Sequence, residues 1–199
     1  AAEAIRQADA VAGADRMLHS VEKYLDGKER LCSYKSGEIL DWFLEKPELK
    51  SLAVVYSGDT GFYSGAGQMT EEVHLRNQTQ NLNLKVQVIP GVSTVSYLCA
   101  KLQIPWQDVC LSSIHGRDAD LKELLTDHKK VFLLLGGQNP VETLCRQLTE
   151  MGFGKALVSV GSRLSYPEEQ IVSGEAEKLA ETGAGQQVGA LCAALIQRP

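Results

Sequence analysis

A glycine-rich segment, SGDTGFY at residues 57–63, follows the apolar run LAVVY and places a carboxylate, Asp59, beside two glycines. Glycine can take positive φ and lets a backbone approach a ligand closely, so Gly58 and Gly61 suit a ligand-cradling loop. Ligands of open α/β sheets lie outside the carboxyl ends of strands, where this loop is expected. The spacing matches neither a P-loop nor a G-x-G-x-x-G turn. A plain turn, in which Asp59 bonds its own backbone, explains the same residues equally well.

A second candidate, IPGVST at residues 89–94, also joins an apolar run to a helical pattern. Ser93 or Thr94 can cap the helix and leave its first amide donors, at the positive end of the helix dipole, for an anion. A carboxylate suits such a site as well as a phosphate does. A purely structural N-cap is the alternative interpretation.

A third candidate, SIHGR at residues 113–117, has polar side chains at alternate positions, so an extended backbone would project Ser113, His115 and Arg117 to one side. Arg117 can pair with a substrate carboxylate through two parallel hydrogen bonds. His115 is a candidate proton acceptor, although a single histidine is as often structural. The cysteine and histidine spacings match no zinc pattern, and no nucleophile elbow is present.

The hydrophobic pattern predicts alternating helices and strands that would position these motifs. In the first part of the chain, helices are predicted over residues 3–11 (entering a short strand), 36–46, 71–81 and 93–102. Strands are predicted at SLAVVYSGD (51–59) and KVQVIPG (85–91), each followed by a glycine turn and a helix. This order predicts a mostly parallel sheet.

A second series of elements begins after Pro105, which ends the preceding helix. Strands are predicted at residues 109–114, 131–137, 156–162 and 188–196, and helices at 121–125 and 140–151. We therefore predict two α/β domains with mostly parallel or mixed sheets, the first over residues 1–108 and the second over 109–199. The sequence opens directly in a helix, so the strand expected before it is truncated or absent.

The composition narrows the class of protein. The 199 residues are 44% hydrophobic and 23% charged, and the net charge of -5 does not suit a general nucleic-acid binder. No run reaches the roughly 20 apolar residues that span a bilayer, and no signal peptide is recognisable. Five cysteines without a C-x-x-C pair predict buried, reduced thiols, no metal site and a cytoplasmic location.

Taken in order, several segments resemble the tetrapyrrole (corrin/porphyrin) methylase family: YSGDTGFYSG, VIPGVST, SSIHGR, LLLGGQNP and RLSYPEEQI. Together they are similar to the branch that methylates C5 of cobalt-precorrin-7 or precorrin-6Y in cobalamin biosynthesis. Each motif is weak alone, whereas their joint order is specific. The resemblance implies a methyltransferase that uses S-adenosyl-L-methionine, bound in the cleft between two domains. It also implies a homodimer, with transient contacts to neighbouring pathway enzymes.

The resemblance further implies roles for particular residues. The cofactor would contact seven residues in loops that follow strands: Gly58, Asp59, Phe62, Ser93, Thr94, Leu135 and Gly161. The tetrapyrrole substrate would contact Ser113, Arg117 and Tyr166. His115 would assist proton loss, and any cobalt would belong to the substrate.

Two departures from the family pattern and three alternatives stand beside this interpretation. The family normally opens with a strand and a GxGPG loop, and this sequence begins after the point where they would lie. Some relatives carry an acidic residue, used in proton handling, where Ala14 stands here. This proton-handling role is therefore not transferred to the present chain. The alternatives are methylation of another ring position, a non-catalytic metabolite-binding protein, and a diphthamide-type methylase. SIHGR and LSYPEE argue against the last.

Overall fold

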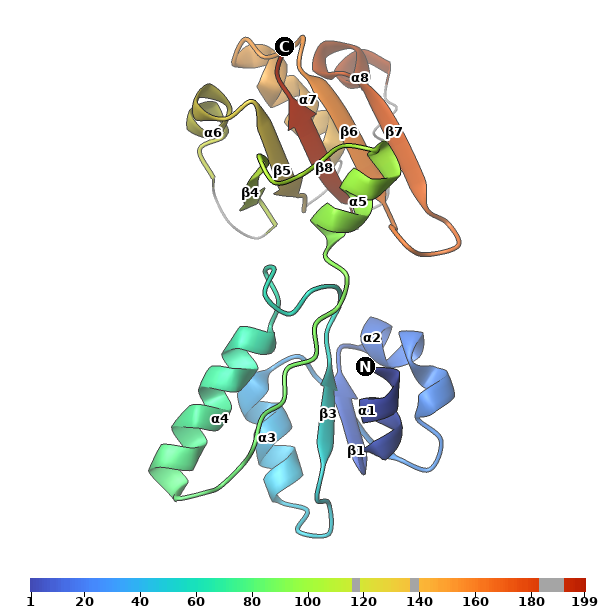
Figure 1. Cartoon of the computed structure of the whole chain (residues 1–199), viewed down its shortest axis with the longest axis vertical. Coiled ribbons are helices and arrows are strands. Elements are labelled where there is room, and N and C mark those ends of the chain that lie inside the picture. Colours follow the sequence, from blue (N-terminus) through green and yellow to red (C-terminus); the bar gives the residue numbers. More distant parts are fainter. Residues whose placement is uncertain (116–118, 137–139, 183–191) are drawn as a thin grey trace. The chain divides into compact units, whose positions relative to one another are not determined.

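The computed structural model describes residues 1–115, 119–136, 140–182 and 192–199, which form two compact units (Figure 1). The units are Ala1–Ser93 and Thr94–Pro199. They divide before α5 (Thr94–Leu102), a helix that the sequence assigned to the first domain, because Leu98 of this helix packs against Gly161 in the second unit. The boundary at residue 108 stays a prediction. Within the described ranges, no helix is long and apolar enough to cross a membrane.

The first unit is built on a parallel sheet in the order β2-β1-β3, and its strands lie at Glu29–Cys32, Ala10–Gly13 and Leu52–Val55 respectively. All four residues of β1 are buried, because this strand is central and both of its faces are covered. The predicted parallel arrangement is confirmed. Since the three strands run in one direction, their carboxyl ends meet at one edge of the sheet.

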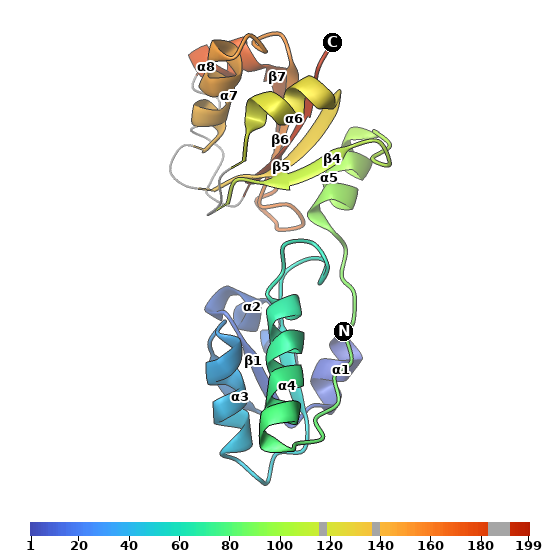
Figure 2. The same cartoon turned by 90° about the vertical axis from the view of Figure 1, so that its left-hand side faces the viewer.

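Helices cover both faces of this sheet (Figures 1 and 2). One face packs against α3 (Ser36–Leu44) and α4 (Ala66–Gln80). The other packs against α1 (Ala2–Gln7), α2 (Asp15–Ser20) and the 3-10 turn η1 (Glu22–Tyr24). Successive strand residues alternate between the two cores. Val54 joins Ile39 and Met69 on the first face, whereas Val55 joins Ile5 and Leu18 on the second.

The segment KVQVIPG at residues 85–91 is not a strand, contrary to the sequence prediction. A groove of about 780 Å³ is lined by β3 and by residues 83–91. The backbone of the segment joins no strand ladder, although its alternating pattern is typical of a strand. Val86 and Val88 are accordingly exposed.

The second unit contains a five-stranded mixed sheet in the order β4-β5-β8-β6-β7. In chain order, its strands lie at Cys110–Ser113, Lys130–Leu134, Leu157–Ser162, Gln170–Glu175 and Cys192–Gln197. Strand β8 is antiparallel to both β5 and β6, and β4 is parallel to β5. Strands β4, β5 and β6 therefore all run in one direction, and their carboxyl ends share an edge of the sheet.

Three helices, α6 (Leu121–Asp127), α7 (Pro140–Glu150) and α8 (Ala176–Thr182), cover one face of this sheet. Their apolar side chains pack on β5, β6 and β8 in a single buried cluster that includes Leu125, Leu144 and Val158. Helix α5 packs on the opposite face. The predicted α/β class with parallel and mixed sheets is confirmed.

Most predicted elements are present, with shifted ends. Helices α3, α5, α6 and α7 lie where they were predicted, and α4 begins before its predicted start. The elements that were not predicted are α2, η1, β2, β7 and α8. They are short, and β2 and β7 expose much of their surface, so their apolar pattern is weak.

Candidate functional site

The loop after β3 forms a compact turn around Asp59. Its carboxylate oxygen Oδ1 accepts a hydrogen bond from the backbone N–H of Gly61 at 2.7 Å, and its carbonyl accepts one from Phe62 N at 3.3 Å. Gly58 has a φ of 70°, in the left-handed region that favours glycine. The plain turn in which Asp59 bonds its own backbone is therefore present. The loop that contains this turn lies at the carboxyl edge of the sheet.

The backbones of SGDTGFY and PGVST are in direct contact. A Cβ atom built on Gly91 would lie 2.1 Å from the carbonyl oxygen of Gly58, much closer than real Cβ atoms approach any atom. The missing side chain of Gly91 therefore permits this approach. Gly58, Thr60 and Gly91 also line the 780 Å³ groove. The two motifs that the sequence singled out separately form one surface of the first unit.

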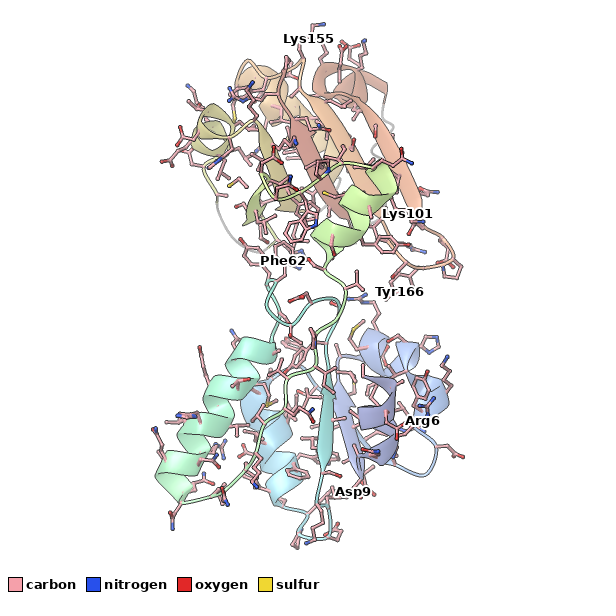
Figure 3. All side chains as sticks on the ribbon, in the orientation of Figure 1. Arg6, Asp9, Phe62, Lys101, Lys155 and Tyr166 are labelled. Carbon is pink, nitrogen blue, oxygen red and sulfur yellow. The ribbon has the colours of Figure 1, made fainter. Side chains whose placement is uncertain are left out.

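Two aromatic side chains extend this surface. Figure 3 shows Phe62 at the tip of the loop that follows β3. Its ring packs edge-on against Tyr63, with centroids 5.0 Å apart and an interplanar angle of 74°. Ser93 ends the first unit, and Thr94 is the first residue of α5; both side chains are half-buried. The flat apolar ring of Phe62 is half-buried, and its contact with a ligand stays a prediction.

The predicted site residues of the second unit collect at the shared carboxyl edge of β4, β5 and β6. Ser113, Leu134, Ala193 and Gly161 occupy one row across the sheet, each paired with the next. His115, Leu135 and Tyr166 follow the ends of these same strands. The topology thus brings together residues that are distant in the sequence. Arg117, the third polar residue of SIHGR, lies outside the described residues.

The ring of His115 has a defined orientation. Its Nδ1 lies 3.2 Å from the carbonyl oxygen of Leu135, and its backbone N–H donates to Ser113 Oγ at 3.3 Å. A carbonyl can only accept, so Nδ1 carries the proton and Nε2 of the neutral ring is the acceptor. A Cβ on Gly136 would lie 2.6 Å from Nδ1, so this glycine makes room for the ring. His115 is exposed, which leaves its ring accessible to a substrate.

Leu135 and Gly161, predicted to contact the cofactor, have structural roles in this unit. The side chain of Leu135 is buried in the core, and its carbonyl binds His115. A Cβ on Gly161 would lie 2.7 Å from a methyl group of Leu164 and 2.9 Å from one of Leu98. The small size of Gly161 thus serves the packing of α5 and the β6–β7 loop. The contacts of Leu135 and Gly161 with a cofactor stay a prediction.

Glu169 is a residue to which the sequence analysis gave no role. Its carboxylate accepts hydrogen bonds from Tyr97 Oη at 2.6 Å and from Ser165 N at 2.7 Å, and pairs with Lys101 Nζ at 2.8 Å. Lys101 first, then Tyr97 and Ser165, lower the pKa of Glu169 from 4.5 to about 2. These three donors stabilise the ionised form. In the sequence, the only signal for this cluster of Glu169, Tyr97, Lys101 and Ser165 is the acidic pair Glu168 and Glu169 in SYPEEQ.

This pKa predicts how stability depends on pH. Because the folded-state pKa is lowered, ionised Glu169 stabilises the fold fully above pH 4.5 and loses this effect as pH falls toward 2. Urea midpoints of the wild type and of Glu169→Gln are therefore expected to differ most at neutral pH and to converge as pH falls through this window. Glu168→Gln, a change at the exposed neighbour, is the control. A difference that does not change with pH would contradict the assignment.

Metal-ligating groups and thiols were the other candidates for chemistry among the described residues. Among them, no group of three His, Cys, Asp or Glu side chains is placed to hold a metal ion. Burial raises the pKa of the Cys145 and Cys192 thiols to about 11, so neither is an activated nucleophile. The candidate groups are loop backbones, one carboxylate and one imidazole. Such groups bind and orient small molecules and accept protons.

Comparison with known proteins identifies the family. Residues 1–180 match the Tetrapyrrole (Corrin/Porphyrin) Methylases. The chain belongs to this family. It is accordingly a methyltransferase, and its two α/β units are those of the tetrapyrrole methylases. The family prediction made from the order of the loop motifs is confirmed.

Individual tetrapyrrole methylases extend the comparison. The chain is 30% identical to the cobalt-precorrin-7 C(5)-methyltransferase of Salmonella typhimurium over 86% of this chain and 80% of that protein. In fold it is similar to the precorrin-6Y methylase of Archaeoglobus fulgidus, with a TM-score of 0.67, 24% identity, and coverage of 99% of this chain and 88% of the other. The uroporphyrin-III C-methyltransferase of Thermus thermophilus, solved with S-adenosyl homocysteine, gives a TM-score of 0.70 at 19% identity, covering 99% and 84%.

Proposed function

We propose that this methyltransferase transfers the methyl group of S-adenosylmethionine to C5 of a corrin-ring precursor of the cobalt-precorrin-7 or precorrin-6Y type. The observation that carries the proposal is the 30% identity with the Salmonella C(5)-methyltransferase across most of both chains. The similarity to a methylase solved with S-adenosyl homocysteine supports the choice of cofactor.

The residues of the first unit fit a cofactor with amino, carboxylate and ribose groups. The close contact of Gly91 with Gly58 brings the backbones of two exposed loops together, and their peptide groups would face a flat or extended molecule. Asp59 offers a carboxylate to hydroxyl or ammonium donors, and Phe62 offers an aromatic face. Gly58, Asp59, Phe62 and Ser93 of this unit would hold the cofactor, together with Thr94, the first residue of the second unit.

The chemistry then needs alignment and one proton acceptor. Bound S-adenosylmethionine would supply a methyl group on a good leaving group, a sulfonium: as C5 bonded to the methyl carbon, the methyl–sulfur bond would break and its electron pair would stay on sulfur. Holding the two reactants in line supplies most of the acceleration. Restoring the unsaturation at C5 releases a proton. His115 would accept this proton at Nε2, because its Nδ1–H is committed to Leu135.

Substrate recognition would rest on the second unit. Tyr166 would stack on the macrocycle, and Ser113 and Arg117 would contact its periphery. Ser113 is buried and its hydroxyl accepts from His115 N, so its contribution would pass through the turn that presents His115. We also propose a cytoplasmic homodimer with transient contacts to neighbouring pathway enzymes. Size-exclusion chromatography with light scattering tests the dimer.

Turnover with a carbon-13-labelled methyl donor tests the reaction. We expect the purified protein, mixed with labelled S-adenosylmethionine and cobalt-precorrin-7 or precorrin-6Y, to give one new methyl resonance correlated with C5. A methyl group on another ring carbon would show that the protein catalyses a different methylation step. Calorimetric binding of S-adenosyl homocysteine without any turnover would favour a metabolite-binding protein.

A further inference from the structure

The loop that joins β6 to β7, residues 163–169, is closed by one carboxylate. Glu169 Oε2 accepts the backbone N–H of Ser165 at 2.7 Å, and the N–H of Glu169 itself donates to the carbonyl of Tyr166 at 3.1 Å. The N–H of Tyr166 in turn donates to the carbonyl of Arg163 at 2.9 Å. The backbone on both sides of Tyr166 is thereby held by a chain of hydrogen bonds that ends on Glu169.

The same carboxylate connects this loop to α5. Tyr97 Oη donates to Oε2 at 2.6 Å, and Lys101 Nζ lies 2.8 Å from Oε1 and 5.4 Å from the centre of the Tyr97 ring. Tyr97 and Lys101 are one turn apart on the helix, so both reach the same point. The side chain of Glu169 is only 18% exposed, although the loop around it is largely open. Figure 3 shows Lys101 and Tyr166 on the same flank of the second unit.

This loop requires such a restraint because its backbone is in a conformation that side chains disfavour. Arg163 has a φ of 46° and Ser165 a φ of 69°, both in the left-handed region. Residues other than glycine stay there only when their surroundings hold them. Leu164, between them, packs with Leu98 over Gly161 and so fixes the loop from its apolar side. Glu169 supplies the polar half of the same attachment.

We propose that Glu169 is a positioning residue for the tetrapyrrole substrate, holding Tyr166 at the edge of the sheet where His115 also lies. The inference rests on the proposed function, because that function assigns Tyr166 to the macrocycle. Beyond that assignment, Glu169 is the group that holds Tyr166 in place for this contact. A carboxylate that accepts from two side chains of α5 and one backbone amide of the loop orients the loop in a way that a simple turn would not.

Kinetics of matched variants test the proposal. In Glu169→Gln, the geometry of the loop relaxes, and we expect the KM for the tetrapyrrole to rise about tenfold while the KM for S-adenosylmethionine stays within about twofold. Tyr97→Phe, which removes one donor and keeps the ring, should show a smaller rise. Glu168→Gln, an equal change on the exposed neighbouring residue, should behave as the wild type. Unchanged KM values in Glu169→Gln, or equal rises for both substrates, would overturn the proposal.

Two further readouts separate this proposal from the proposed function. Amide hydrogen exchange at residues 163–169 should accelerate in Glu169→Gln and stay unchanged in Glu168→Gln, whatever reaction the protein catalyses. If the wild type turns over neither precorrin, the proposed function fails. The binding of a cobalt corrinoid polycarboxylate such as cobyrinic acid, followed by tyrosine fluorescence, then tests Glu169 alone. Weaker binding by Glu169→Gln supports the positioning role, and equal binding, or none by the wild type, overturns it.

Discussion

Substitution of Gly91 by alanine is expected to reduce the affinity for S-adenosyl homocysteine by about tenfold or more, at a modest cost in stability. The added Cβ would lie 2.1 Å from the carbonyl oxygen of Gly58 and 2.9 Å from its carbonyl carbon. Neither atom belongs to a flexible side chain, so the two loops must separate. Overpacking costs about 1–3 kcal/mol, and the low end applies here because both glycines are exposed and their loops can move apart.

Gly67→Ala is the matched control for this prediction. A Cβ at Gly67 meets no atom within 4 Å, and the residue lies in α4, where alanine is favoured over glycine by up to about 1 kcal/mol. This variant should bind as the wild type and be equally or more stable. Isothermal titration calorimetry gives the affinity, and urea unfolding gives the free energy of unfolding. Wild-type affinity in Gly91→Ala would show that the contact between the two loops does not shape the cofactor site.

Replacement of His115 by alanine should lower kcat by about 10²–10⁴-fold if its imidazole accepts the proton released from the substrate. Its Nδ1 is held by the Leu135 carbonyl, so the loss of the ring removes an oriented acceptor rather than a structural support. The KM for S-adenosylmethionine should change little, because the proposed partner of the His115 imidazole is the proton of the tetrapyrrole and not a group of the cofactor. Single-turnover kinetics measure the step directly.

Gly136→Ala tests the same role without removing the imidazole. Its Cβ would lie 2.6 Å from His115 Nδ1 and 3.0 Å from His115 Cα, so the ring must leave the Leu135 carbonyl. We expect kcat to fall in the same direction as in His115→Ala, with a smaller loss. His128→Ala, at an exposed histidine after α6, is the control for general effects of losing an imidazole. Full turnover in both His115→Ala and Gly136→Ala would exclude the proton-transfer role.

The sequence by itself determined the α/β class, the positions of most helices and strands, and the family. These features are encoded locally: apolar periodicity marks an element over a few residues, and glycine, proline and hydroxyl residues mark its ends. The order of the loop motifs indicated the tetrapyrrole methylases, and the family match over residues 1–180 agrees with it. Local pattern also misled once, at residues 85–91, because alternation predicts a strand whether or not a partner strand is adjacent.

Only the tertiary structure decided which of these residues lie together. Gly91 lies on the carbonyl of Gly58, and the carboxylate of Glu169 binds Tyr97, Lys101 and Ser165, through strand order and helix packing that local pattern does not specify. The parallel direction of β4, β5 and β6 brings His115 and Tyr166 to one edge of the sheet. Such contacts depend on register, because a shift of one residue would turn each side chain to the other face. The motifs could therefore be read along the chain, whereas their grouping into sites required the fold.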